Sequence, residues 1–581
     1  MENFDCVVVG AGWYGLAAAK QYHVTHPTGS LVVFDEQSTL GGTWAAERLY
    51  PLLKSNNLLG TLEYPDFPMT TARFGVKTDN YVPGEVVHEY HQAYATEFGI
   101  VEHIRLRTKV LSAEHLDGAE GGWILTTAFT DAGGKQEQKL VKARRLIVAT
   151  GITSDAFLPH FRGQETFGGR VFHGKHFRQN RDTLKTAKSA VVFGGHKFAW
   201  DAAYAYATSG VETHMVIRAS GHGPCWMSPS YVTPLKKWIE KLANIRALTW
   251  FSPCIWGNVD GYGGIRNFLH GTALGRKIVD IFWSVLGGDV LALNKYDAHP
   301  ETAKLKPWLP AMYSGTSFSI LNYDTDFFQL VKDGKIRVHV SDITHLSPGK
   351  VHLSDGVQLP ADVLLATTGW GHADAQILAT FPRLRDEPVW DAHYTPITDL
   401  PGIVPPTEVD TDATASATAA ATELATPAPS AQLTPFVLHR FIVPPTAQSL
   451  RARDLAFVGS VANFSNVITA HVQGLWVAAY FDGRVRGLGG DLSNGEGKGL
   501  EEIRREALLH NRFGRWRYPV DWGSRTPSFI FDAVPYLDLL LSDLGLQTHR
   551  KGGLVAELFS PYGPEDYRGV NEEWAAAEGR A

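Results

Sequence analysis

Three glycines near the N-terminus have the spacing of a phosphate-binding turn. The sequence D-C-V-V-V-G-A-G-W-Y-G ends an apolar, β-branched run at Gly10 and continues with Gly12 and Gly15 before an alanine-rich stretch with helical spacing. In such a strand–turn–helix unit, Gly10 lets the chain reverse, Gly12 leaves room for a pyrophosphate, and Gly15 lets helix and strand pack closely. The N–H groups at the start of the helix then bind the phosphates. The spacing predicts a dinucleotide-binding site; the alternative is a glycine turn in another kind of α/β protein.

Carboxylates and small residues follow the next predicted strand. The strand L-V-V-F runs directly into Asp35 and Glu36, which places a carboxylate where the ribose of a dinucleotide needs a hydrogen-bond acceptor. The run G-G-T-W follows and includes Gly42, Thr43 and Trp44, where small residues permit the close approach of a large flat cofactor. Both features favour dinucleotide binding over the alternative.

A third apolar strand, R-R-L-I-V-A-T-G, ends at Thr150 and Gly151. Because Gly10 and Gly151 both end apolar strands, we expect both to open onto the cofactor face of one sheet. The proline-punctuated segment after Trp44 carries Asn56 and Asn57 between leucines, so at least one of these amides is expected to face inward. Without further context, a role in shaping a turn is favoured for them.

A histidine lies within a motif of fixed spacing. Phe167, Gly169, His173 and Phe177 follow the pattern F-x-G-x-x-x-H-x-x-x-F. A histidine considered alone is more often a hydrogen-bonded structural residue than a reactive one. The coincidence of four residues makes His173 a candidate functional residue.

A second nucleotide unit is predicted after this motif. The strand A-V-V-F ends at Gly194 and Gly195, and an alanine-rich helix opens near Lys197. The following strand ends at Arg218, where a cation can pair with a 2′-phosphate and so select NADP over NAD; a solvated charge at a strand end is the alternative. His196 stands where the second glycine usually lies, so the pyrophosphate must approach differently or more weakly here.

Composition limits the class of protein. A chain of 581 residues is too long for one core, so we expect two or more domains. A net charge of −6 argues against a general nucleic-acid binder. Cys6, Cys225 and Cys254 are far apart, which excludes a Cys-x-x-Cys redox centre. The apolar stretch that begins at Ile278 is too short and too charged to span a bilayer. We therefore expect a cytoplasmic protein with no integral membrane segment and no leader ahead of Asp5.

Taken together, these motifs resemble those of the flavin-containing monooxygenases, which are class B flavoprotein monooxygenases. The variant G-G-H-K-F-A-W-D and the run I-R-A-S-G-H-G-P-C-W-M are similar to the branch common in fungal secondary metabolism. The resemblance implies FAD on the first unit and NADPH on the second. It also implies that reduced flavin takes up O₂ as a C4a-(hydro)peroxide, which delivers one oxygen atom to a small-molecule substrate.

The resemblance also assigns roles to single residues. Asn56 matches the family asparagine beside the flavin, which favours a functional role over the turn-shaping one. His173 matches the motif histidine, which is thought to help position the nicotinamide rather than to act as a base. In the family that the sequence resembles, Baeyer–Villiger enzymes often end this motif in Trp followed by Pro or Asp, and many have an arginine near the flavin. Here the motif ends in Phe177-Arg178, and residues 307–326, the expected counterpart of the arginine segment, contain neither Arg nor Lys. Both differences favour oxygenation of nitrogen or sulfur over the Baeyer–Villiger oxidation of a ketone.

The sequence therefore predicts an α/β protein with two Rossmann-like dinucleotide-binding domains, the NADPH domain being inserted in the FAD domain. The expected boundaries are 1–165 for the first part of the FAD domain, 166–345 for the NADPH domain with a helical insertion, 346–500 for the second part of the FAD domain, and 501–581 for an aromatic-rich C-terminal extension. Residues 405–435 are Ala/Thr/Pro-rich and are read as a flexible insertion. A third interpretation is a flavoprotein with a degenerate NADPH site that serves as a binding protein or another flavin oxidoreductase.

Overall fold

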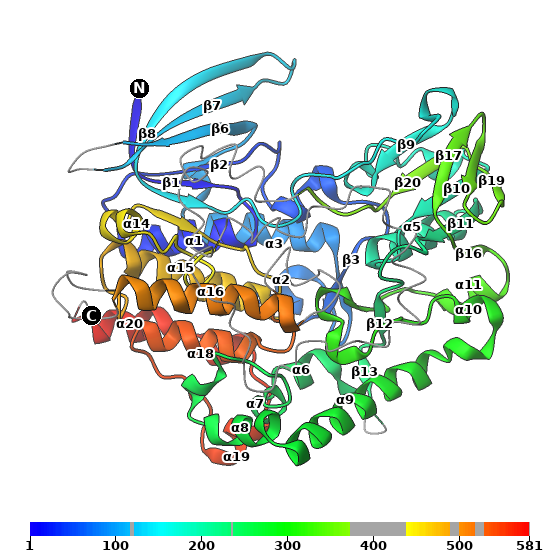
Figure 1. Ribbon diagram of the computed structural model, residues 1–581. Helices are drawn as coiled ribbons and strands as arrows, with labels where there is room; N and C mark the ends of the chain where they lie inside the picture. Colours follow the sequence, from blue (N-terminus) through cyan, green and yellow to red (C-terminus); the bar gives the residue numbers. More distant parts are fainter. Residues whose placement is uncertain (117–120, 234–235, 372–436, 489–498, 518–527, 580–581) are drawn as a thin grey trace.

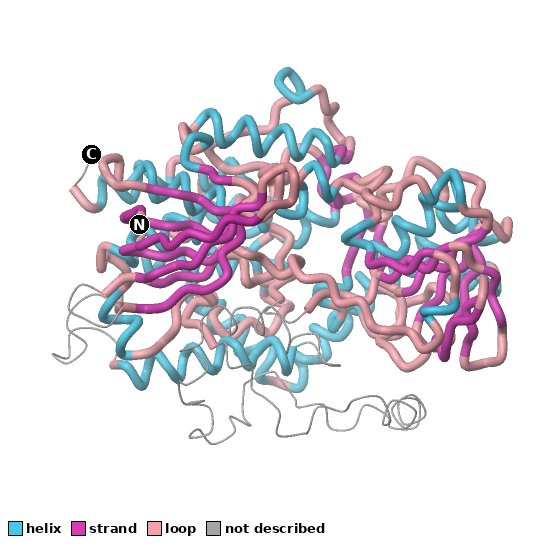
Figure 2. Tube along the Cα trace, turned by 90° about the horizontal axis from the view of Figure 1, so that it is seen from above, coloured by secondary structure: helices cyan, strands magenta, loops and turns pink. Residues whose placement is uncertain are grey.

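The computed structural model describes residues 1–116, 121–233, 236–371, 437–488, 499–517 and 528–579 (Figure 1). The predicted flexible insertion, 405–435, lies outside these residues. Two separate sheets stand at opposite ends of the molecule, with loops and helices between them (Figure 2). None of the helices in the ranges above has the length and apolarity needed to cross a bilayer.

The first sheet is built around β1 (Glu2–Val9), whose last residues are an apolar run with little exposure on either face. A strand buried on both faces is typical of a parallel sheet covered by helices. The strand order is β5-β2-β1-β8-β7-β6, and β21 pairs with β8. The remaining strands are β2 (Leu31–Phe34), β5 (Ile104–Arg105), β6 (Thr108–His115), β7 (Trp123–Thr130), β8 (Gln136–Val148) and β21 (Leu455–Phe457).

Helices α1 (Trp13–Thr25) and α15 (Asn466–Phe481) pack against each other beside this sheet, together with α3 (Gly84–Glu97) (Figure 1). All residues of α15 after Asn466 are buried, as expected of a helix that is apolar all round. Because β21 and α15 follow the second unit in the sequence, the first unit is built from two segments that are far apart along the chain.

The second sheet has the order β16-β11-β10-β20-β9, and all its strands are parallel. Helix α5 (Lys197–Thr208) crosses from β10 to β11, as in a βαβ unit. These two units confirm the predicted α/β fold. The strands are β9 (Arg170–His173), β10 (Ser189–Phe193), β11 (Glu212–Ile217), β16 (Ile336–Val340) and β20 (Val363–Ala366). Since β20 pairs with β9 and β10, the second sheet runs past residue 345, the expected domain boundary.

Residues 222–330, which show no clear pattern in the sequence, form β12 (Trp226–Ser228), β15 (Phe318–Ile320) and several helices. These helices include α6 (Ile239–Ala243), α7 (Arg246–Thr249), α8 (Gly263–Gly271) and α9 (Ala273–Asn294). The C-terminal part contributes α16 (Leu500–Arg517), α18 (Ala533–Asp543), α19 (Leu554–Phe559) and α20 (Val570–Ala577).

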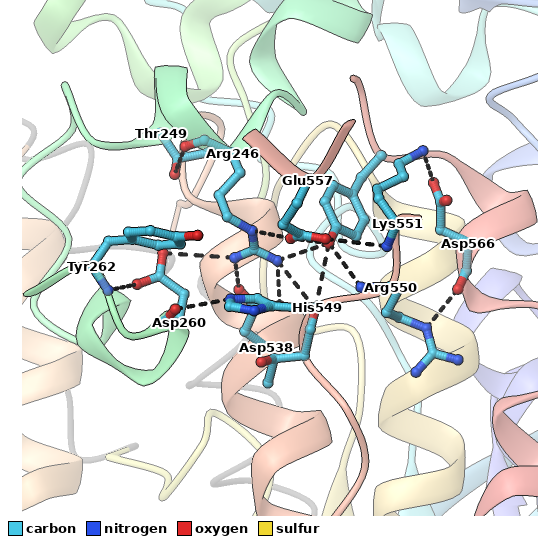
Figure 3. A network of polar contacts seen from close by, with 12 residues as sticks. Arg246, Thr249, Asp260, Tyr262, Asp538, His549, Arg550, Lys551, Glu557 and Asp566 are labelled. Atoms are coloured by element: carbon cyan, nitrogen blue, oxygen red, sulfur yellow. Dashed lines mark hydrogen bonds and ion pairs between the residues drawn. The ribbon is translucent and has the colours of Figure 1, made fainter. Parts of the chain in front are cut away.

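A buried arginine joins these two regions (Figure 3). Arg246 is fully buried, and its guanidinium donates to Asp538 and, at 2.5 Å, to Glu557 Oε1. It also donates to the hydroxyl of Tyr562 at 3.0 Å. Burial by itself would lower the pKa of Arg246, but the carboxylate of Asp538 raises this pKa above its usual value, so Arg246 stays charged. The C-terminal extension is thereby fixed against the helical insertion.

Candidate functional site

The candidate site begins at the carboxyl ends of the parallel strands of the first sheet, where ligands of open α/β sheets bind. Gly10 follows β1 with φ +108°, and a Cβ added to it would lie 2.5 Å from the carbonyl oxygen of Ala149. A Cβ on Gly15 would lie only 1.9 Å from the oxygen of Gly10. Both positions therefore require glycine, for the turn and for the approach of α1 to β1.

Gly12 is the N-cap of α1, and the first turn of this helix carries no acidic residue. The Gly41 N–H donates to the oxygen of Ala11 at 2.8 Å, so the G-G-T-W run lies directly against the glycine turn. The N-terminus of a thirteen-residue helix is thus lined by two glycine segments. This arrangement fits a pyrophosphate, which needs free N–H donors and no intervening side chain.

Asp35 lies at the end of β2 and is buried. Its carboxylate accepts hydrogen bonds from the N–H groups of Ala11 at 2.7 Å and Gln37 at 2.8 Å, and burial raises its pKa. Asp35 therefore holds the glycine turn against β2, and each oxygen keeps a second lone pair for a ribose hydroxyl. Glu36 is exposed and lies 3.6 Å from Lys109 Nζ.

A cavity of about 370 Å³ opens beside Glu36. Arg48 is one of its cations; it donates to the oxygen of Thr153 at 2.9 Å, and burial lowers its pKa to about 10, which leaves it protonated at neutral pH. Lys175 donates to the oxygen of Ser154 at 2.5 Å. The cations that line the cavity are Arg48, Arg107, Lys109 and Lys175, against the carboxylates of Glu36 and Glu47. This excess of positive charge fits a ligand that carries phosphates. Arg48 and Lys175 lie in no motif that marks them as site residues in the sequence.

The loop after β8 meets the G-G-T-W run. Thr43 Oγ1 and Thr153 Oγ1 lie 3.1 Å apart, and Thr153 follows Thr150 and Gly151 closely. Gly151 has φ +69°, and no atom lies within 4 Å of a Cβ added to it. Trp44 packs, half-buried, against the main core. The structure therefore brings the predicted residues of three separate segments to one edge of the sheet.

A fourth segment, after β21, belongs to the same edge and was not assigned to the site from the sequence. Gly459 has φ +76°, and a Cβ on it would lie 2.7 Å from the ring of Tyr14 in α1. The hydroxyl of Tyr14 donates to Asn466 Oδ1 at 3.2 Å, at the start of α15. The sequence does contain a signal for this segment: an apolar strand ends at Gly459 and a helix follows, as at Gly10.

The second sheet carries a similar turn after β10. Gly194 has φ +145°, and a Cβ on it would lie 2.0 Å from Thr367 Oγ1. A Cβ on Gly195 would lie 2.8 Å from the oxygen of Gly223. His196 is the N-cap of α5 and is exposed. The turn is thus tight like that of the first unit, with an imidazole at the place of the second glycine.

The two cations predicted for the second unit differ in their surroundings. Lys197 donates to Asp201 and, at 2.8 Å, to Asn322 Oδ1, so its ammonium is directed at protein groups. Asp201 also accepts a hydrogen bond of 2.7 Å from the hydroxyl of Tyr50, which joins α5 to the first unit. Arg218 follows β11, is exposed, and forms no ion pair within the described ranges. Its guanidinium is the one available to a ligand phosphate.

The motif histidine is buried at the end of β9. His173 Nδ1 accepts a hydrogen bond of 3.1 Å from the Lys175 N–H. The His173 and Trp370 rings are in edge-to-face contact, with their centroids 5.1 Å apart. Burial lowers the pKa of His173 to about 4, so the ring is neutral at neutral pH. Phe167 and Phe177 are buried in two different cores of the second unit. His173 thus accepts a main-chain N–H through Nδ1, while its buried Nε2 has no hydrogen-bond partner among the described residues.

Asn56 lies on β3 (Lys54–Leu58) and is exposed. Its Nδ2 donates to Ser319 Oγ on β15 at 3.2 Å, while Asn57 is directed at Glu240 on α6. The stretch 307–326, which lacks Arg and Lys, thus lies against the asparagine strand. Lys54, the cation of β3 itself, is paired with Asp324.

Comparison with known proteins gives consistent similarities. The profile of the "Flavin-binding monooxygenase-like" family matches residues 5–226. The FAD-dependent monooxygenase rstn6 of Aspergillus nomiae is 30% identical over 591 residues, which cover 99% of each chain. The polycyclic ketone monooxygenase of Thermothelomyces thermophila has a TM-score of 0.62 at 15% identity, covering 93% of this chain and 88% of that one. Cyclohexanone monooxygenase from Rhodococcus sp. Phi1 bound to NADP+ has a TM-score of 0.57 at 17% identity, covering 100% and 98%.

Proposed function

The chain belongs to the FAD-dependent monooxygenases, and we propose that it uses NADPH and O₂ to add one oxygen atom to the nitrogen or sulfur of a small organic molecule. The family predicted from the sequence is thereby confirmed. The observation that carries the proposal is the presence of two glycine turns, each at the end of a parallel strand and each opening a helix. FAD, when bound, supplies hydride acceptance and oxygen activation.

The residues of the first turn and its neighbours would hold FAD. Gly10 and Gly12 would leave the N-terminus of α1 open to the pyrophosphate, and Asp35 would accept a hydrogen bond from the ribose. The segment that begins at Gly42 and the loop of Thr150 and Gly151 would cover the flat ring system. Arg48 and Lys175 would add positive charge near the phosphates.

The second turn would hold NADPH. Gly194 and Gly195 would receive the pyrophosphate and Arg218 the 2′-phosphate, while His173 would fix the backbone beside the nicotinamide. Lys197 would bind a phosphate of NADPH only if its ammonium gave up its hydrogen bonds to Asp201 and Asn322. A solved structural neighbour bound to NADP+ supports this assignment.

The preference for nitrogen or sulfur rests on the charge around Asn56. Residues 307–326 contain no Arg or Lys, and they touch the asparagine strand through Ser319 and Asn322. An anionic oxidant of the kind that attacks ketones would lack a cationic partner from this segment. Baeyer–Villiger oxidation of a ketone is the second candidate, and the ketone monooxygenases among the structural neighbours favour it.

The test is a panel of amines, thioethers and ketones offered to the FAD-loaded enzyme with NADPH in air. Oxygenated amine or thioether is the expected product, and NMR locates the added oxygen. A lactone or ester as the sole product would replace the proposal by the ketone reaction. Protein that neither retains FAD on native purification nor binds added FAD would contradict both.

A third function, a flavoprotein with a degenerate NADPH site, is favoured by His196 in the second turn. Anaerobic mixing of the flavin-loaded protein with NADPH tests it. Bleaching of the flavin absorbance on a catalytic timescale rules the degenerate site out, and no bleaching supports it.

We also propose the division of the chain into an FAD unit, 1–165 resumed near residue 367, and an inserted NADPH unit. The pairing of β20 with β10 supports a boundary near residue 367 in place of the one expected at residue 345. Helix α18 of the C-terminal extension packs with α15, which supports a place for this helix on the first unit.

A further inference from the structure

The strand that carries Asn56 is not held by a regular ladder. Strand β3 pairs with β4 (Tyr81–Pro83) only at Lys54 and Leu58, and the register shifts between these two positions. The three residues Ser55, Asn56 and Asn57 therefore form an irregular stretch without ladder pairs of their own. Their conformation has to be fixed by side chains.

Neutral groups hold one side of this stretch. Ser55 Oγ donates to the oxygen of Asn57 at 2.6 Å and accepts the Val82 N–H at 3.0 Å. Asn322 Nδ2 donates to the oxygen of Ser55 at 2.9 Å. Asn56 itself donates to Ser319 Oγ at 3.2 Å. None of these contacts changes with pH in the physiological range.

The remaining contact is to a titratable group. Asn57 Nδ2 donates to Glu240 Oε1, whereas Glu240 Oε2 has no hydrogen-bond partner within the described ranges. Glu240 is only 5% exposed. A buried carboxylate with one oxygen unpaired is costly, and a glutamine at this position would accept the same hydrogen bond without that cost. The hydrogen bond between Glu240 and Asn57, the neighbour of Asn56 in the chain, therefore points to a role in the reaction.

The helix of Glu240 is also linked to the start of α15. Asn244 Nδ2 donates to the main-chain oxygen of Glu240 at 3.1 Å, and Asn244 Oδ1 accepts a hydrogen bond of 2.9 Å from Ser465 Oγ. Ser465 is the N-cap of α15. Helix α6 thus bridges β3 and the start of α15.

We propose that Glu240 is a positioning residue of this monooxygenase: when ionised, it holds Asn57, and through the same irregular stretch Asn56, in the arrangement that oxygen transfer requires. This role rests on the proposed function. Protonation makes Glu240 Oε1 a weaker hydrogen-bond acceptor for Asn57. Asn56 is then held less firmly, and NADPH oxidation becomes uncoupled from product formation.

The charges around Glu240 place this change near neutral pH. Burial raises the pKa of Glu240 to about 7, and the polar side chains of Thr61, Asn57 and Trp238 offset it only in part. The positive charge of Lys241, whose ammonium lies over the Trp238 ring, lowers that pKa slightly. The other cations on the neighbouring strands are Lys237, which is exposed, and Lys54, which is paired with Asp324.

The test compares the wild-type holoenzyme with Glu240→Gln between pH 5.5 and 8.5. In the wild type, we expect hydrogen peroxide released per NADPH to rise at least about 5-fold as the pH falls through 7. In Glu240→Gln, the ratio should stay constant within about 2-fold. The matched control is Glu63→Gln, which removes another glutamate whose pKa is raised by burial and whose carboxylate binds the Met69 N–H instead. This control should keep the wild-type profile.

A second readout does not depend on turnover. In the difference between the infrared spectra of the wild type and Glu240→Gln, the band of a protonated carboxyl should appear as the pH falls through 7. The band of Asp538, whose pKa burial raises to about 6, is present in both proteins and cancels. If the peroxide ratio of Glu240→Gln depends on pH as it does in the wild type, or if no such band appears, the role of Glu240 alone is overturned. NADPH oxidation that gives no oxygenated product at any pH contradicts the proposed function, and this role with it. If Glu240→Gln does not fold, Lys241→Gln replaces it, and the midpoint of the peroxide profile should move to higher pH; an unmoved midpoint overturns the role.

Discussion

Gly12 and Gly42 lie face to face, so that a Cβ added to Gly42 would come within 3.0 Å of the Cα of Gly12. A Cβ on Gly12 would still lie at 3.5 Å from Gly42 Cα, which is ordinary contact. The two segments therefore form one glycine-lined surface at the N-terminus of α1. A methyl group at Gly12 is tolerated by the protein itself, but a larger side chain has to enter the space that the pyrophosphate needs.

The first prediction follows from this contact. Gly12→Val should abolish FAD binding, because its γ-methyl groups would occupy the surface between the two turns. The flavin-to-protein absorbance ratio after native purification measures it. Gly264→Val is a suitable control, since no atom lies within 4 Å of a Cβ at that exposed position. Stoichiometric FAD in Gly12→Val would show that the turn is not the FAD site.

Asn56 should matter for coupling rather than for reduction. Asn56→Ala removes an exposed amide donor beside Ser319, so hydrogen peroxide released per NADPH should increase by about 10-fold or more, while anaerobic reduction by NADPH keeps its rate. Asn80→Ala, which removes another exposed amide, should behave as the wild type. Unchanged coupling in Asn56→Ala would remove this residue from the mechanism.

Arg218 should discriminate between the two nicotinamide cofactors. Loss of a charge-assisted contact costs about 1.5–3 kcal/mol, so Arg218→Ala should raise the KM for NADPH about 10- to 100-fold and leave that for NADH nearly unchanged. Arg181→Ala, which removes another exposed arginine of the same unit, serves as the control. Equal effects on both cofactors would argue against a contact with the 2′-phosphate.

Arg246 should be essential for stability. Arg246→Met leaves the carboxylates of Asp538 and Glu557 buried without their cation, which costs about 3–5 kcal/mol. We expect the apparent Tm to fall by several degrees and the C-terminal extension to become sensitive to proteolysis. Arg276→Met on the exposed face of α9 should change the Tm very little. An unaffected Tm in Arg246→Met would mean that the network of Figure 3 does not hold the extension in place.

The buried carboxyl of Glu240 gives a prediction for stability against pH. Its folded-state pKa of about 7 lies above the ordinary value of 4.5, so the folded protein favours the protonated form. The resulting stabilisation is complete below pH 4.5 and is lost as the pH rises through 7. A pKa difference of this size corresponds to a loss on the order of 3 kcal/mol. Glu240→Gln should therefore melt at a higher temperature than the wild type at pH 8.5 and at about the same temperature at pH 5. A constant difference at all pH values would exclude this titration.

The local sequence determined the elements and their ends. Apolar runs that stop at Gly10, Gly151 and Gly194 predict strands followed by tight turns, because only glycine adopts the backbone angles and the close approaches found there. The fold class and the family could be read from these turns and their spacing. Asp35 was also placed correctly at the end of its strand, although its bond to the Ala11 N–H could not be foreseen.

The tertiary structure alone decided which side chains meet. Arg48 and Lys175 line one cavity with Glu36, Lys197 is directed at Asp201 and Asn322, and Asn57 reaches Glu240 across 183 residues of sequence. No local pattern encodes these contacts, because each depends on how two packed units and a helical insertion place their surfaces against one another. Charge and hydrogen-bonding capacity belong to the residue, whereas burial and partner belong to the fold, and the pKa of Glu240 is set by the latter.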